Sequence, residues 1–287
     1  MIINDIDTKI DNEHSQFFRV LETISNSDIY QKYTPELSYQ HKLGHIQKVL
    51  LFSQIIAQNE KLEKNYIKIL LTSAAFHDCG RIKDRDNGEH GLSSAKIAGK
   101  YFRENIKNQY EITLNEIGVV QSAIEYHVIV EQIPGQIDEL KLKEICYKYN
   151  VNIEEFDKVK LISAILKDAD ALDRTRFISG SDLNSNFLRT KTAKKQVMIE
   201  FAKKINEEYA NQVINVNYNT VQNIFASKVK LLHCIRHKYK IENGGIHIKE
   251  IDVPLNIIKT IFYGTLLDRE YIVDNVVYSK CEEESER

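Results

Sequence analysis

The sequence predicts an all-α fold, and three observations support this prediction. Only three prolines, Pro35, Pro134 and Pro254, occur in 287 residues, which leaves room for long uninterrupted helices. Lysine, glutamate, leucine and isoleucine are abundant, and most of these residue types favour helices. Apolar residues also recur at intervals of three and four, as they do on the buried face of a helix.

The composition limits the class of protein. A chain of 287 residues with 43% apolar residues can bury a substantial core in one large domain or two modest ones, and we expect a single helical body. The net charge of −2 argues against a protein built on a basic nucleic-acid-binding face. Because the N-terminus is acidic and no apolar run could cross a membrane, we expect a cytoplasmic protein without a membrane partner. The four scattered cysteines predict free thiols.

The chain divides into four predicted segments. They are an N-terminal helical segment (1–37), a core that holds the predicted chemistry (38–177), a C-terminal helical region (178–280) and an acidic tail (281–287). We expect the C-terminal region to pack on the core or to form a lid or a subunit contact. Its predicted helices span 191–209, 220–239 and 253–267, with a short extended stretch at 246–251.

The first strong helix of the core begins near His41. His41 and His45 are four residues apart and share one face of this helix, and apolar residues follow His45 towards the core. The helix therefore enters the core with a histidine near its start. We favour His45 as the functional residue and place His41 at the surface, although either imidazole could act as a ligand.

The next helix carries the most informative motif. Residues 67–76 form an apolar helical run that ends at His77, Asp78 and Gly80. An unpaired charge at the end of a buried helix costs several kcal/mol, so the pair must be hydrogen-bonded, ion-paired or metal-bound. Adjacent helical side chains diverge by roughly 100°, so one ion can contact both only near the helix end. Other helices must supply the remaining ligands.

Three later positions supply candidates for those ligands. His90 lies where a polar loop meets a helix, and could instead cap or pair near that helix. A helix that opens with the capping-box pattern at residues 113–116 places His127 on its inward face, as a ligand or as an ordinary core histidine. A helix over residues 153–173 carries Asp170 on an apolar stripe, which is unusual for a carboxylate without a partner.

Neutral imidazoles and carboxylates together form a mixed nitrogen and oxygen donor set. Such a set suits Mn, Fe, Co, Ni or Zn better than Mg, which prefers oxygen ligands. Four ligands from His45, His77, Asp78 and Asp170 would leave positions open on a six-coordinate ion for water and a phosphate oxygen. Open positions are typical of catalytic rather than structural metal sites.

The order and spacing of these motifs resemble the HD superfamily of metal-dependent phosphohydrolases. The matching segments are residues 45–49 (HIQKV), 76–81 (FHDCGR) and 169–172 (ADAL). The resemblance covers roughly residues 38–177, about half of the chain. It implies an all-α HD-domain helical bundle, here with additional C-terminal helices, in which His45, His77, Asp78 and Asp170 hold one divalent metal ion.

The resemblance also implies catalytic roles for Asp78, Arg81, His90 and His127. His90 and His127 match histidines that, in many HD proteins, bind a second metal or contact the scissile phosphate. Forms with two metals usually have a further histidine beside the position of His127, which the segment Tyr126-His127-Val128 lacks. The motif at residues 77–81 is closest to the His-Asp-x-Gly-Lys form, whose cation can touch phosphate. Arg81 could do so bidentately, or could be an ordinary surface arginine.

The range of possible substrate classes is narrowed mainly by sub-family motifs that the sequence lacks. These are the Gly-Tyr-Pro signature of cyclic dinucleotide phosphodiesterases, the His-Asp-x-x-Glu-Asp pattern of alarmone hydrolases and the His-Asp-x-Gly-His motif of dNTP triphosphohydrolases. The resemblance implies a phosphohydrolase that uses a metal-activated water on a phosphate ester of a nucleotide or similar small molecule. The alternatives are an HD-type nuclease acting on single-stranded nucleic acid and a non-catalytic, metal-stabilised binding or signalling module.

Several charged residues near the motifs receive secondary interpretations. Asp168 and Asp173 are expected to cap helices or to support the ligands, and Asp168 is the alternative ligand to Asp170. Asp84 belongs to a solvated loop or assists proton transfer. Arg174, Arg176 and Arg189 form an ordinary mixed surface or a basic rim for the substrate.

Overall fold

The computed structural model describes most of the predicted core and shorter parts of the flanking regions. The described residues are 16, 19–20, 23, 43–83, 88–105, 107–108, 110–176, 183–214, 240–242, 245–248, 251–254, 271–273 and 276–278. The acidic tail, the predicted helix over 220–239, His41 and Asp84 therefore lie outside the described residues.

The core is helical, as predicted. Its α-helices are α4 (Leu43–Asn59), α5 (Lys64–Phe76), α6 (Glu89–Glu104), α7 (Ile117–Tyr126), α8 (Glu139–Lys148) and α9 (Phe156–Asp173), and the C-terminal region continues with α10 (Lys191–Lys194) and α11 (Gln196–Ile214). Three short 3-10 helices join them: η2 (Ile153–Glu155), η3 (Arg174–Arg176) and η4 (Ser185–Phe187). No strand occurs among the described residues of 43–214, which confirms the all-α class for the core.

Short antiparallel strands follow α11. The strands β1 (Lys240–Glu242), β2 (Gly245–Ile248) and β3 (Ile251–Pro254) form one sheet in that order, and β4 (Tyr271–Val273) pairs with β5 (Val276–Tyr278). The described residues of the predicted extended stretch at 246–251 thus lie in the paired strands β2 and β3. The predicted helix over 253–267 is wrong at its start, because Val253 lies in β3 opposite Ile246, where β-branched residues pack well across strands.

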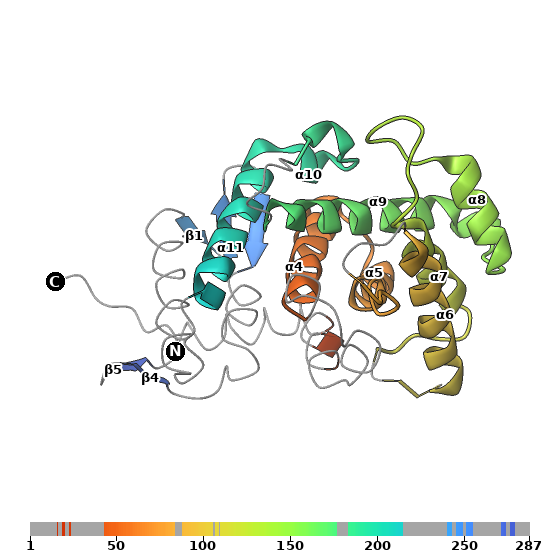
Figure 1. Ribbon diagram of the computed structural model, residues 1–287, viewed down its shortest axis with the longest axis horizontal. Coiled ribbons are helices and arrows are strands. Elements are labelled where there is room, and N and C mark those ends of the chain that lie inside the picture. The colour runs from red at the N-terminus through yellow and green to blue at the C-terminus, as the bar shows by residue number, and fades with distance from the viewer. Residues whose placement is uncertain are drawn as a thin grey trace.

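Helix α9 is the element around which the core is assembled. It packs against α4, α5 and α7, and α6 in turn packs on α7 (Figure 1). The apolar stripe that predicts α9 is buried along its whole length, from Phe156 to Leu172. Helix α4 is buried on nearly all sides, with Ile46, Val49 and Leu50 fully inaccessible to solvent. Helices α4, α5 and α9 pack on one another, and α4 and α9 both reach the His77 turn at the end of α5.

The end of α5 is fixed by aromatic packing and by one close backbone approach. The ring of Phe76 lies 5.1 Å from that of Phe102 and 5.2 Å from that of Tyr110, in tilted and edge-to-face geometry. Gly80 lies so close to α6 that a β-carbon there would stand 2.4 Å from the backbone nitrogen of Ser94. The glycine therefore lets α6 bring its N-terminus, and His90, up to the His77 turn.

One helix begins later than its sequence pattern predicts, and one helix has no predicted counterpart. The carboxylate of Glu116 accepts from the backbone N–H of Thr113 at 2.9 Å, as in a capping box, but the helix begins only at Ile117. Helix α8 was not predicted, although Asp138 caps it by accepting from the backbone N–H of Lys141 at 3.0 Å.

Among the described residues, every helix is too short or too polar to pass through a bilayer.

Candidate metal centre

His45 enters the centre from the first turns of α4. Its Nδ1 lies 2.6 Å from a carboxylate oxygen of Asp173, and its side chain is 1% exposed. An ionised carboxylate only accepts hydrogen bonds, so Nδ1 carries the proton of the neutral ring. The other nitrogen, Nε2, is then unprotonated and is directed towards His77.

His77 follows the last residue of α5 and is fully buried. Its Nδ1 donates to the carbonyl oxygen of Ala74 at 2.7 Å, so its Nε2 is also unprotonated in the neutral ring. The two Nε2 atoms, of His45 and His77, are 3.1 Å apart. Two buried lone pairs that face each other at this distance repel, whereas a cation between them would attract both. The ring orientations therefore fit a metal site.

Two carboxylates complete this first donor group. Oδ2 of Asp78 lies 3.6 Å from Nε2 of His45 and 3.9 Å from Nε2 of His77. Oδ1 of Asp170, on the inward side of α9, lies 3.4 Å and 3.9 Å from the same two nitrogens. Ligands about 2.1 Å from one ion stand between about 3 Å and about 4 Å apart, for neighbouring and opposite positions of an octahedron, so each carboxylate could share an ion with the two histidines.

A second donor group lies on the other side of Asp78. Its Oδ1 is 3.1 Å from Nε2 of His90 and 3.8 Å from Nε2 of His127, and these nitrogens are 3.2 Å apart. Nδ1 of His127 donates to the carbonyl oxygen of Ile124 at 2.5 Å, which leaves Nε2 of His127 unprotonated. Asp78 thus directs one oxygen towards each donor group. It belongs to two sets of three residues that could each hold a metal, one with His45 and His77 and the other with His90 and His127.

Arg81 spans the two groups. Its Nε donates to Oδ2 of Asp78 at 3.0 Å, and its Nη2 lies 2.8 Å from Nε2 of His90. A guanidinium can only donate, so Nε2 of His90 accepts this bond. Arg81 therefore supplies a positive charge within the second donor group.

The protonation states favour metal binding at neutral pH. Burial lowers the pKa of His77 to about 3 and also lowers the pKa of His127. Burial alone would raise the pKa of Asp78, but the neighbouring imidazole of His77 and the guanidinium of Arg81 hold it well below its usual value. Metal ligation requires neutral imidazoles and ionised carboxylates, and these shifts maintain both.

The stability of the metal-free protein is expected to fall as the pH is lowered from about 6.5 towards 4. In the folded protein His77 and His127 resist protonation, whereas the unfolded chain takes up protons near pH 6.5. The loss is about 1.4 kcal/mol per pH unit for His77, whose folded-state pKa is about 3, and His127 adds to it because its pKa is also lowered. Urea unfolding across this range measures the slope, which His77→Leu should reduce. A flat profile in the wild type would contradict neutral, buried histidines.

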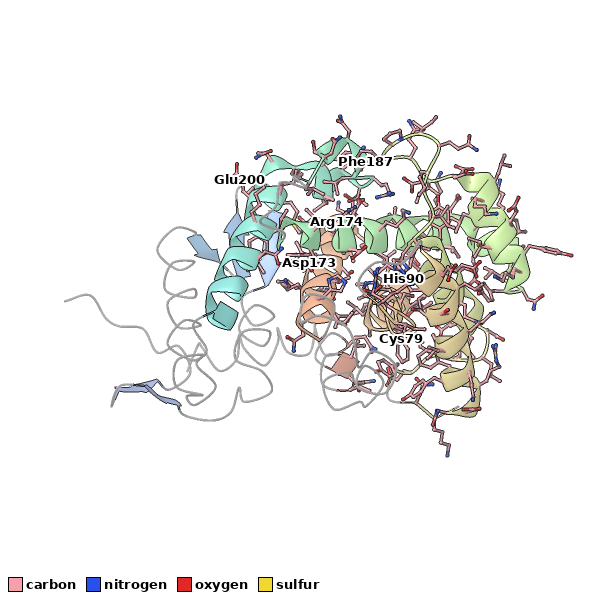
Figure 2. The ribbon with its side chains drawn as sticks, in the orientation of Figure 1. Cys79, His90, Asp173, Arg174, Phe187 and Glu200 are labelled. Carbon is pink, nitrogen blue, oxygen red and sulfur yellow. The ribbon has the colours of Figure 1, made fainter. Side chains whose placement is uncertain are left out.

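The centre opens to solvent on one side. The side chain of Asp170 is 32% exposed, whereas those of His45 and Asp78 are at most 2% exposed. Figure 2 labels two residues that flank the centre, Asp173 on the α4 side and His90 on the α6 side. A substrate would therefore reach the donor groups past Asp170.

Asp168 does not join the ligands. Its carboxylate accepts from the backbone N–H groups of Arg189 and Thr190, at 2.9 Å and 2.7 Å, and from the Thr190 hydroxyl at 2.8 Å. Residues two apart on a helix point roughly 200° from each other, so Asp168 and Asp170 face opposite sides of α9. Asp168 thus supports the segment before α10.

The arginines do not form a basic rim together. Arg189 donates to both carboxylate oxygens of Glu131, at 2.7 Å and 2.8 Å, and to Asp168 at 3.0 Å. Arg189 therefore pairs with two buried acids. Of the three arginines, Arg174 is the one whose side chain is described as exposed. The side chain of Arg176 lies outside the described part of the chain.

Three residues that support the centre were missed by the sequence analysis. Lys48 pairs with the carboxylate of Asp173, and Asn206 accepts from the ammonium of Lys48. Lys167 donates to the carbonyl oxygens of His127 and Ile129 at 3.1 Å and 2.6 Å. Lys48 and Lys167 interrupt apolar helical stripes, and that interruption is the one sequence signal that could have indicated buried, partnered lysines.

Comparison with known proteins identifies one family. Residues 43–175 match the family model of the HD domain, which includes all four proposed ligands of the first donor group. No curated protein and no solved structure matches the chain.

Proposed function

We propose that this protein, which belongs to the HD domain family through residues 43–175, hydrolyses a phosphate ester of a nucleotide or a similar small molecule with a divalent metal ion. The observation that carries the proposal is the convergence of the unprotonated Nε2 atoms of His45 and His77 upon Asp78 and Asp170. Two imidazoles and two carboxylates favour Mn, Fe, Co, Ni or Zn over Mg.

The first donor group would hold the ion. His45 and His77 would each contribute Nε2, and Asp78 and Asp170 a carboxylate oxygen. When bound, a divalent ion in such a site activates water and polarises a phosphoryl oxygen. The protein contributes the fixed ring orientations through Asp173 and the carbonyl of Ala74, so that little reorganisation accompanies binding.

The second group and Arg81 would bind the phosphoryl group. The guanidinium of Arg81 can donate two parallel hydrogen bonds to phosphate oxygens, and its side chain is 14% exposed. His90 and His127 stand beside it and would line the same phosphoryl-binding position. Asp78 contacts both donor groups and would hold the bound phosphoryl group at a fixed distance from the ion.

We expect one tightly bound ion per chain, because Arg81 already places a positive charge against Asp78 and His90. Val128, which follows His127, adds no ligand because a hydrocarbon side chain has no donor atom. Replacing Arg81 by methionine should raise the metal content towards two ions, measured by elemental analysis after dialysis against Mn²⁺. Arg103→Met, which changes an exposed arginine of α6, should stay at one ion. Two ions in the wild type, or one in Arg81→Met, would contradict this expectation.

The substrate class is tested with a panel of phosphate compounds. Protein loaded with Mn²⁺, Co²⁺, Ni²⁺ or Mg²⁺ is incubated with nucleotides, other phosphomonoesters and phosphodiesters, and a labelled single-stranded oligonucleotide. Release of phosphate or a nucleoside from small substrates supports the proposal. Cleavage of the oligonucleotide alone would assign a nuclease, and absence of turnover with tightly bound metal would assign a binding module.

A further inference from the structure

A buried lysine and aspartate stand behind the ligand His45. Oδ2 of Asp173 accepts from Nδ1 of His45 at 2.6 Å, and its Oδ1 lies 2.9 Å from the ammonium nitrogen of Lys48. The side chains of Lys48 and Asp173 are 5% and 0% exposed. The ammonium therefore balances the carboxylate charge and fixes its orientation, so that His45 can donate to it as a neutral ring.

Helix α11 completes this arrangement through Asn206. Oδ1 of Asn206 accepts from the ammonium of Lys48 at 2.5 Å, and its Nδ2 donates to the Thr175 hydroxyl at 2.8 Å. Asn206 is 2% exposed, and its amide also lies 3.4 Å from the backbone oxygen of Asp173. These contacts join α11 to Lys48 of α4 and to the end of α9 at Asp173 and Thr175.

Asn206 lies outside the segment that matches the family model, which ends at residue 175. Helix α11 packs on α9 and on η3, so the contact belongs to a packed interface and not to an isolated side chain. The C-terminal region thus reaches the support of the metal centre, in addition to covering the core.

We propose that Asn206 is a positioning residue that sets the metal affinity of the centre through Lys48, Asp173 and His45. The inference rests on the proposed function, because it assumes that His45 is a metal ligand. Without the Asn206 amide the buried ammonium would lose an acceptor and shift, and the Asp173 carboxylate would lose its fixed orientation. Loss of such support behind a ligand typically weakens metal binding by about 10-fold to 100-fold.

The test compares three variants of α11 in the full-length protein. Asn206→Leu removes both hydrogen-bonding groups, Asn206→Asp keeps an oxygen for Lys48, and Lys203→Leu changes an exposed residue of the same helix. The dissociation constant for Co²⁺ is measured by competition with a chelating dye, and the absorption spectrum of bound Co²⁺ reports its ligand geometry. Circular dichroism and thermal unfolding show whether each variant is folded.

We expect Asn206→Leu to weaken Co²⁺ binding by about 10-fold or more and to alter the spectrum, with Asn206→Asp and Lys203→Leu close to the wild type. Wild-type affinity and spectrum in Asn206→Leu would overturn the inference. If Asn206→Leu does not fold, weak binding by a folded Asn206→Asp would overturn it as well. Wild-type protein that takes up no Co²⁺ would instead overturn the proposed function.

Discussion

Replacing Asp78 by alanine is expected to remove both the bound metal and the hydrolytic activity. Asp78 directs one oxygen towards His45 and His77 and the other towards His90 and His127, so the substitution weakens both donor groups at once. A metal ion supplies several kcal/mol of charge stabilisation in the transition state, so kcat/KM should fall by about a thousandfold or more. Elemental analysis of protein purified without chelator, together with hydrolysis rates, measures both effects.

Asp78→Asn is the matched companion of this variant. It preserves the side-chain volume and one carbonyl oxygen but lacks the charge, so it should retain less metal than the wild type and more than Asp78→Ala. Asp138→Ala, which removes the cap of α8, should leave the metal content unchanged. Full metal content and turnover in folded Asp78→Ala would contradict the assignment of the site.

Two aspartates that are two residues apart on α9 should respond in opposite ways. Asp168→Ala leaves the buried guanidinium of Arg189 without one of its acids and two backbone N–H groups without their acceptor. Removing one partner of a buried ion pair typically costs about 3–5 kcal/mol of unfolding free energy. Asp170→Ala removes a partly exposed carboxylate from a ligand group, so the metal-free protein should change by less than about 1 kcal/mol.

The same two variants should reverse their order in a metal-binding assay. Asp170→Ala should lose most of its affinity for Mn²⁺, whereas folded Asp168→Ala should bind Mn²⁺ nearly as the wild type does. Urea unfolding of the metal-free proteins and dialysis against Mn²⁺ measure the two properties separately. Equal metal affinity in Asp170→Ala and the wild type would show that Asp170 is not a ligand.

The helices of the core could be predicted because their signals are local. Apolar spacing and the glycine after His77 define α5, and the stripe that ends at Asp170 defines α9. Helix α8 is not predicted because its apolar pattern is weak. Only Leu142, Ile145 and Cys146 of this helix are buried. The start of β3 was assigned to a helix because Val253 and its neighbours suit either element until a partner strand is known.

The support of the centre could not be predicted, because it depends on contacts between distant parts of the chain. His45 meets Asp173, and Lys48 meets Asn206, across more than 120 positions of sequence. No spacing rule relates such residues. The choice between Asp168 and Asp170 also needed the fold, since only the packing of α9 decides which side faces His45.

The most direct measurement is the anomalous diffraction of crystals grown with Mn²⁺ or Co²⁺. We expect one strong anomalous peak within bonding distance, about 2.0–2.3 Å, of Nε2 of His45, Nε2 of His77 and carboxylate oxygens of Asp78 and Asp170. A fully occupied ion held elsewhere, or His45 and Asp170 pointing away from the ion that His77 binds, would contradict it.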